Sequence, residues 1–177
     1  MRRLFCTAAL LAVTAVAAPA AEPITGDWMV KDNLAYIRIV NCAGKLWGVI
    51  AWEKEPGLDT NNPDPAKRSR PLLGSVVLKA MAPTKPGLWE GEVYNSNDGK
   101  MYIAKISLSS PDVLKLEGCI LGGWFCGGEN WTRVRGPETP APAKMQKGAK
   151  APPVPPNTLN PSVDICSTVA EGAGPAH

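Results

Sequence analysis

The sequence predicts an all-β domain, an eight-stranded antiparallel up-and-down barrel, followed by a disordered Pro/Ala-rich C-terminal tail. Short apolar or alternating runs recur between clusters of Gly, Pro, Asn and Asp, and no run keeps a helical period through several turns. Most connections between these runs are tight. Eight meandering strands with one apolar face lose their exposed edges by closing into a barrel. A sandwich of two sheets is the alternative.

The N-terminus has the pattern of a signal peptide over residues 1–20. Its first three residues are Met-Arg-Arg, residues 4–18 are apolar, and Ala-Pro-Ala at 18–20 offers the small residues that a signal peptidase cuts. A transmembrane anchor is the alternative, but about 15 apolar residues fall short of the roughly 20 that a spanning helix needs. We therefore expect a protein of the periplasm, or a secreted one.

Charge and composition exclude several classes of function. Removing Arg2 and Arg3 reduces the 19 basic residues to 17, against 16 acidic ones. A nearly neutral chain lacks the positive field that gathers phosphate backbones, so no nucleic-acid partner is expected. His177 is the only histidine, so no Ser-His or Cys-His pair can be assembled. We expect no enzyme, no metal and no cofactor.

The folded domain is predicted to span residues 21–135. Its eight strands are expected at 24–30, 34–41, 45–53, 71–80, 87–94, 100–108, 112–120 and 126–135. Alternation is clear in the sixth, where Tyr102, Ala104 and Ile106 share a face opposite Lys105. An outer-membrane barrel is disfavoured because the polar faces carry Glu and Lys where lipid would lie.

The connection 54–70 is the exception among the loops, because loops of this length in a compact domain are usually functional or disordered. Counting the ends of the barrel places it with 31–33, 95–99 and 121–125 at an open end. The candidate ligand-binding residues are Asp59, Asn62, Asp64, Arg68, Arg70, Asn97, Asp98 and Lys100 on the rim and Trp52, Trp89, Tyr94 and Tyr102 in the cavity.

An apolar cavity with a polar rim is the usual anatomy of a small-molecule site. The alternative is a barrel filled by its own side chains. Asp59, Asn61, Asn62 and Asp64 also look faintly like oxygen ligands for calcium, but the run lacks a glycine pivot and a final glutamate. Hydrogen-bonded Asx turns are the expected role of these residues. For Arg68 and Arg70, salt bridges to this acidic run are the alternative to ligand binding.

The mature cysteines are Cys42, Cys119, Cys126 and Cys166, and an even number in an exported chain indicates disulfides. The hairpin with Cys42 lies at the opposite end of the predicted barrel from the hairpin with Cys119 and Cys126. We therefore expect Cys119–Cys126 and, by elimination, Cys42–Cys166, which would pin the tail, residues 136–177, over the closed end. A free or intermolecular Cys166 is the alternative. The tail is rich in Pro, Ala, Lys and Gly and cannot bury enough apolar surface to offset the entropy cost of ordering it. We therefore expect it to be mostly disordered or extended.

The two ends of the domain carry a recognisable pair of motifs. Gly26-Asp27-Trp28 opens the first strand, and Trp131-Thr132-Arg133 lies in the last. This arrangement resembles the lipocalin and calycin barrels, in which an arginine of the last strand stacks on a tryptophan of the first. The resemblance implies a structural role for Gly26, Trp28, Trp131 and Arg133. The alternative is that both tryptophans are ordinary core residues.

A second resemblance covers about residues 24–135. It is carried by Asn41-Cys42, Trp52, Asp59-x-x-Asn62-Pro63-Asp64-Pro65, Arg68-x-Arg70-Pro71-Leu72-x-Gly74, Trp89-x-Gly91, Tyr94, Asp98-Gly99-Lys100-x-Tyr102 and Gly118-Cys119. These motifs are similar to a family of small exported bacterial proteins, domain of unknown function 2147. The family implies a fold and a compartment but no activity. Trp47 and Leu73 stand where we would expect its cysteines.

Two functions follow as hypotheses. The first is an exported barrel that binds a small apolar or amphipathic molecule, or an envelope component. The second is a protein-interaction or inhibitor module, of the protease- or lysozyme-inhibitor kind, that acts through its rim loops.

Overall fold

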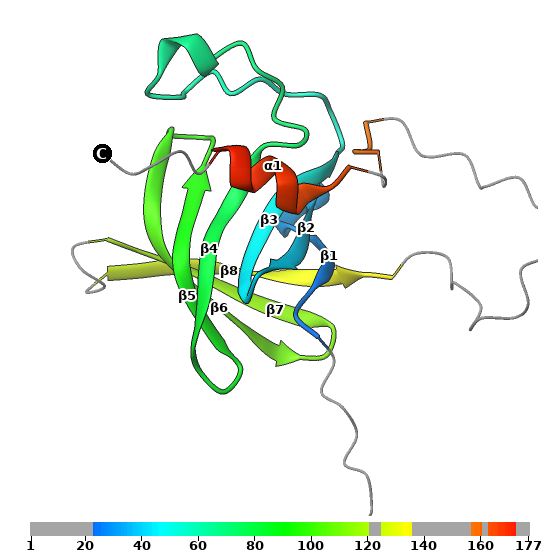
Figure 1. Ribbon diagram of the computed structural model, residues 1–177, viewed down its shortest axis with the longest axis vertical. Coiled ribbons are helices and arrows are strands. Elements are labelled where there is room, and N and C mark those ends of the chain that lie inside the picture. Colours follow the sequence, from blue (N-terminus) through cyan, green and yellow to red (C-terminus); the bar gives the residue numbers. More distant parts are fainter. Residues whose placement is uncertain (1–22, 121–124, 136–156, 161–162, 173–177) are drawn as a thin grey trace, which may run out of the picture.

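The computed structural model describes residues 23–120, 125–135, 157–160 and 163–172. The predicted signal peptide and most of the tail lie outside these residues and stay predictions. Eight antiparallel strands form a closed barrel in sequence order, which confirms the predicted fold class (Figure 1). The strands are β1 (Gly26–Met29), β2 (Ala35–Cys42), β3 (Lys45–Glu53), β4 (Val76–Lys85), β5 (Leu88–Asn95), β6 (Lys100–Ser110), β7 (Val113–Ile120) and β8 (Phe125–Val134).

Closure joins the first strand to the last. β1 pairs with β2 on one side and with β8 on the other, and Trp28 stands opposite Arg133 in the register. Each strand has two paired neighbours, so the two-sheet sandwich is excluded. A closed barrel leaves no strand edge free to pair with another chain.

The fourth strand is displaced from its predicted position. It was expected at 71–80 but runs from Val76 to Lys85. Residues 71–75 instead complete the long connection, where Pro71 bridges Leu58 and Gly74 adopts a φ of 82° that favours glycine. Pro83 is tolerated further along because the pairing with β5 is irregular around it.

One end of the barrel is filled by its own side chains. The largest fully buried apolar residues are Trp28, Ile39, Val49, Leu78, Met81, Ile106 and Leu114. Most of them point inward by strand alternation and pack into one cluster at the end where β1 begins and β8 finishes. This end is therefore closed by packing.

The described parts of the tail are ordered, which its composition did not predict. Helix α1 (Ile165–Gly172) lies on the outer wall of the barrel against β2, β3 and β4, rather than over the barrel end (Figure 1). Ile165 and Val169 are buried there with Val49, because this wall carries apolar side chains on its outer face as well. Cys42 and Cys166 form a disulfide with their Cα atoms 5.5 Å apart.

The second disulfide, Cys119–Cys126, crosses the hairpin of β7 and β8 between two residues that are paired in the register. The structure thus contains both of the cysteine pairs that the end-counting argument predicts. The loop 121–124 at the tip of this hairpin lies outside the described residues.

Candidate ligand-binding cavity

The end of the barrel opposite the packed core is hollow. A cavity of about 830 Å³ opens between the turn at 31–33, the beginning of the long connection, the β5–β6 turn and β8. Pockets for small molecules usually measure about 300–1,000 Å³. The apolar part of its wall is formed by Val30, Leu34, Ala35, Ile37, Ile50, Leu72, Val77, Val93, Leu116 and Trp131. The barrel is therefore filled at one end and hollow at the other.

Two glycines that face each other create part of this space. Gly118 of β7 and Gly127 of β8 are partners in the register, and both line the cavity. A Cβ atom added to Gly118 would meet Tyr102 and Val93 only at 3.7 Å, and one added to Gly127 would meet nothing within 4 Å. Side chains at these two positions would occupy the cavity.

Asp59, predicted to lie on the ligand-binding rim, is fully buried inside the long connection. Its carboxylate accepts hydrogen bonds from the Tyr94 hydroxyl at 2.6 Å, from Asn62 at 2.7 Å and from Arg70 at 2.7 and 2.9 Å. Burial alone would raise the pKa of Asp59, but these hydrogen bonds outweigh it and lower the pKa. Asp59 is therefore a buried anion that joins Asn62 and Arg70 of the loop to Tyr94 of β5.

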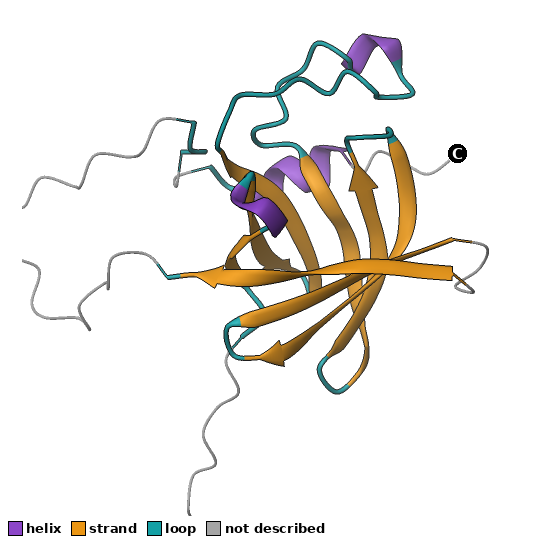
Figure 2. Cartoon of the chain, turned by 180° about the vertical axis from the view of Figure 1, so that it is seen from behind, coloured by secondary structure: helices purple, strands orange, loops and turns teal. Residues whose placement is uncertain are grey.

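The same connection is fastened to the β5–β6 turn. Asn61 donates from its amide nitrogen to the carbonyls of Ser96 and Asn97 at 3.2 and 3.0 Å. Figure 2 shows the loop arching over this end of the barrel. Gly99 makes the approach possible, since a Cβ there would lie 1.8 Å from the Asn61 carbonyl oxygen. The loop is thus held in place rather than free above the mouth.

The other predicted rim residues of this loop also bond within it. Arg68 donates to the Asn62 carbonyl at 2.8 Å, and Asp64 accepts from the Ala66 amide at 3.0 Å and pairs with Lys67 at 3.0 Å. Asp59, Asn62, Asp64, Arg68 and Arg70 are not among the described residues that line the cavity. Any role of theirs in ligand or partner binding stays a proposal.

The predicted aromatic residues divide between the cavity and other places. Tyr102 lines the cavity, and its hydroxyl donates to Asp98, which also accepts from the Lys100 amide at 3.0 Å. Tyr94 lies at the cavity edge with its hydroxyl on Asp59. Trp89 packs against the core of the closed end.

Trp52 lies on the outer wall, stacked on Tyr36 with 5.7 Å between ring centroids. Simple alternation from Ile50 would point Trp52 into the barrel. The pairing of β2 with β3 shifts by one residue at Ala51, because Tyr36 pairs with Trp52 and Ile37 with Ile50. A shift of one residue turns a side chain to the other face of the sheet.

Several charged residues that the sequence did not single out line the cavity. They are Lys31, Asp32, Glu53, Lys54, Glu55 and Glu129. Glu53 is buried, which raises the pKa of its carboxyl group, although hydrogen bonds from the backbone of Gly57 and Leu73 oppose the rise. Glu129 accepts a hydrogen bond from the Trp131 indole at 2.5 Å. The alternation of Glu129, Trp131 and Arg133 along β8 was the signal that could have identified it.

The closed end contains Gly26, Trp28 and Arg133 of the four predicted structural residues, whereas Trp131 lines the cavity. The guanidinium carbon of Arg133 lies 4.2 Å from the ring centroid of Trp28. Arg133 also donates to the carbonyls of Pro23, Thr25 and Pro111. It therefore joins the beginning of the described chain, the β6–β7 turn and the last strand.

The described residues contain no group of three or more His, Cys, Asp or Glu side chains that could hold a metal ion. No helix among them is both long and apolar enough to cross a membrane.

Residues 26–133 match a family described as "Uncharacterized protein conserved in bacteria (DUF2147)". A solved structure, described as protein HP1028 from the human pathogen Helicobacter pylori, which belongs to the lipocalin family, is similar with a TM-score of 0.58. The two chains are 20% identical, and the similarity covers 64% of this chain and 84% of that one. At this identity the similarity shows the fold alone. No curated protein matches the chain.

Proposed function

We propose that this chain, which belongs to the DUF2147 family of bacterial proteins, binds a small apolar or amphipathic molecule in the open end of its barrel. The observation that carries the proposal is the cavity of about 830 Å³, with its apolar wall and charged mouth. The family description names no activity, so the proposal depends on the geometry of the cavity and not on the known activity of a relative.

The chemistry of the wall favours an apolar group. Aliphatic side chains from β2, β3, β4, β5 and β7 surround the space, and Trp131 contributes an indole ring. Burying about 300 Å² of apolar ligand surface at about 25 cal/mol/Å² contributes about 7.5 kcal/mol before the cost of association. A micromolar to millimolar dissociation constant is therefore expected for a simple amphiphile.

The entrance is ordered before any ligand arrives. The long connection is fixed by the buried carboxylate of Asp59 and by the hydrogen bonds from Asn61 to the β5–β6 turn. A preformed entrance avoids the entropy cost of ordering a loop during binding. This supports a binding protein with a built cavity over a surface that forms around a partner.

We place this function outside the cytoplasm, in the periplasm or beyond the cell. The proposal is supported by the basic, apolar and small-residue pattern of residues 1–20 and by two disulfides in the structure. Mass spectrometry of the protein purified from its own cells tests it, because an intact N-terminus would contradict export through cleavage.

Titration with N-phenyl-1-naphthylamine tests the binding function. This neutral dye fluoresces strongly in apolar surroundings, so its fluorescence should rise and saturate with the wild-type protein. Gly118→Leu places a side chain in the cavity and should abolish the rise, while far-UV circular dichroism checks that the barrel has formed. Thr132→Leu adds the same side chain at an exposed position of β8 and is the matched control. Equal dye binding by the two variants would contradict a site inside the barrel.

A further inference from the structure

We infer that the molecule bound in the cavity carries a cationic, ammonium-like head group, which the Glu129 carboxylate receives. The inference rests on the binding function proposed above and specifies the class of ligand. It depends on where Glu129 lies, on the partners of the other charged groups and on the character of the surrounding wall.

Glu129 points into the barrel, on the face where apolar residues are expected. It stands two residues before the buried Trp131 on β8 and opposite Leu116 in the register with β7. A carboxylate costs free energy inside an apolar wall unless a donor compensates it. The Trp131 indole supplies one hydrogen bond, which also fixes the direction of the carboxylate. Among the residues that the structure describes, no other hydrogen bond or ion pair to Glu129 is present.

The sum of the charges that line the cavity favours a cation. Lys31 is followed by Asp32, and Lys54 by Glu55, so each of these two pairs at the mouth sums to zero. Glu53 is buried with hydrogen bonds from the backbone of Gly57 and Leu73. With Glu53 and Glu129, the lining carries four carboxyl groups against the two lysines. The cavity is therefore net negative, and this favours a cationic ligand over an anionic one.

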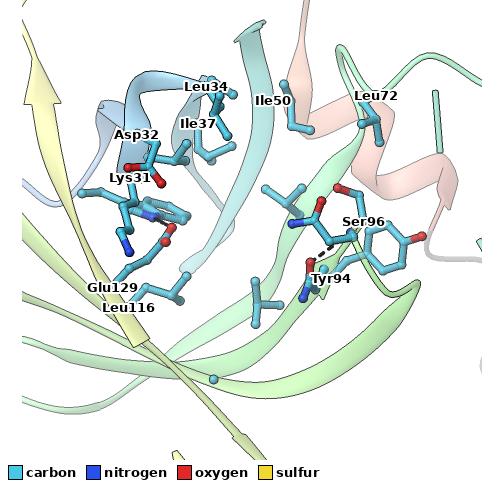
Figure 3. A pocket seen from close by; sticks show the side chains of 18 of the residues that line it. Lys31, Asp32, Leu34, Ile37, Ile50, Leu72, Tyr94, Ser96, Leu116 and Glu129 are labelled. Atoms are coloured by element: carbon cyan, nitrogen blue, oxygen red, sulfur yellow. Dashed lines mark hydrogen bonds between the residues drawn. The ribbon is translucent and has the colours of Figure 1, made fainter. Parts of the chain in front are cut away.

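Figure 3 shows on which side of the cavity the labelled charged side chains lie. Lys31, Asp32 and Glu129 lie on one side of the cavity, among apolar side chains, whereas the side with Ile50 and Leu72 carries none of the labelled charges. The turn at 31–33 contacts β8, which agrees with this view. A ligand with an apolar chain against Ile50 and Leu72 would present its head group to Glu129. Lys31, which is exposed, stands beside that head group and should weaken the binding of a cation.

Three probes with the same dodecyl chain test the inference by displacing N-phenyl-1-naphthylamine at pH 7, below their micellar concentrations. Dodecylamine is cationic, dodecanol is neutral and laurate is anionic. We expect dodecylamine to bind the wild-type protein most tightly and laurate most weakly. Glu129→Gln keeps the acceptor for the Trp131 indole and removes the charge, so it should weaken dodecylamine binding about tenfold and change dodecanol binding less than about threefold.

Two further variants sharpen the test. Lys31→Gln should tighten dodecylamine binding, since it removes the nearby positive charge. Glu90→Gln is the matched control, because Glu90 lies on β5, outside the cavity lining, with Lys105 3.7 Å away. It should leave the affinities of all three probes unchanged.

The outcomes separate the two proposals. If the dye does not bind, or if none of the dodecyl compounds displaces it, the binding function fails and the head-group inference fails with it. If all three displace the dye equally, if laurate binds best, or if Glu129→Gln leaves dodecylamine binding unchanged, the binding function stands and the cationic head group is overturned.

Discussion

At the scale of single residues, Asp59 shows how a charged side chain in a long connection can serve the fold. Its carboxylate is fully buried and is reached by Tyr94, Asn62 and Arg70, which come from three different parts of the loop and sheet. A buried charge of this kind is tolerated only when its hydrogen bonds are satisfied. Asp59 holds the long connection in place and does not itself line the cavity.

Asp59→Asn should lower the free energy of unfolding by about 2–3 kcal/mol, because it leaves Arg70 without its charged partner and places amide donors against donors. Urea denaturation at pH 7 measures the change. Asp64→Asn, an identical substitution at a half-exposed side chain of the same loop, should cost much less. Equal losses in the two variants would show that Asp59 does not hold the loop.

The difference in unfolding free energy between the wild type and Asp59→Asn should change with pH in a direction that the pKa of Asp59 defines. Hydrogen bonds outweigh burial and lower the pKa of Asp59 below its ordinary value of 3.8. The stabilisation is therefore complete above that value and is lost as the pH falls through the lowered pKa. The difference in stability between wild type and Asp59→Asn should be constant from pH 7 to about pH 5 and should shrink below about pH 4. A difference that grows on acidification would contradict this assignment.

The same residues show where sequence reasoning stopped. A salt bridge of Arg70 to the acidic run was one of the two roles that the sequence offered for it, and the structure contains that pair with Asp59. A loop sequence does not reveal which carboxylate is the partner, or that the pair does not line the cavity. Trp52 was assigned to the cavity because alternation cannot detect the one-residue shift at Ala51. Glu129 was missed although alternation with Trp131 placed it on the inner face. An acidic residue on an otherwise apolar face was the available signal.

At the scale of elements, the long connection and the β5–β6 turn form one unit. Their contact depends on Gly99, because the Asn61 carbonyl oxygen occupies the space of a Cβ atom. Gly99 therefore has two roles: it adopts the positive φ that the turn requires, and it leaves room for the long connection.

Gly99→Ala should cost clearly more stability than Gly87→Ala, and the comparison isolates this contact. Both glycines lie in hairpin turns with positive φ, 71° and 75°, so both substitutions carry a similar backbone strain of about 1 kcal/mol. A Cβ at Gly87 meets nothing within 4 Å, whereas one at Gly99 would force the loop away. We expect an additional loss of about 1–2 kcal/mol for Gly99→Ala in urea denaturation. Equal losses would mean that the loop does not dock on this turn.

The elements of the barrel were largely predictable, and helix α1 was not. Strands with alternating faces and tight turns are recognised from local pattern. Helix α1 has only eight residues and follows a proline-rich segment, so its order depends on packing and on Cys42–Cys166 rather than on propensity. The sequence signal for an element that covers the outer wall lay in β3 rather than in the tail. Residues 46–52 of β3 are apolar on both faces, and such a strand is usually covered on both.

At the scale of the whole molecule, the barrel has two ends with different roles. The packed end holds the core and the closure of β1 on β8, and the hollow end holds the cavity. The motifs at the two ends of the domain predicted the closure, because first and last strands meet only in a closed sheet. The volume of the cavity was not predictable, since it depends on how inward side chains fill the space.

Arg133→Lys tests whether a change at the packed end of the barrel alters binding in the cavity at the hollow end. The arginine stacks on Trp28 and donates to three carbonyl groups, and a lysine keeps the charge but loses the planar set of donors. We expect a loss of about 1–2 kcal/mol in the free energy of unfolding. Arg135→Lys, which affects an exposed ion pair with Asp112, should cost less than about 0.5 kcal/mol. The dissociation constant of N-phenyl-1-naphthylamine should stay unchanged in both variants while the barrel is folded. Weaker dye binding by folded Arg133→Lys would show that closure at the packed end also shapes the cavity.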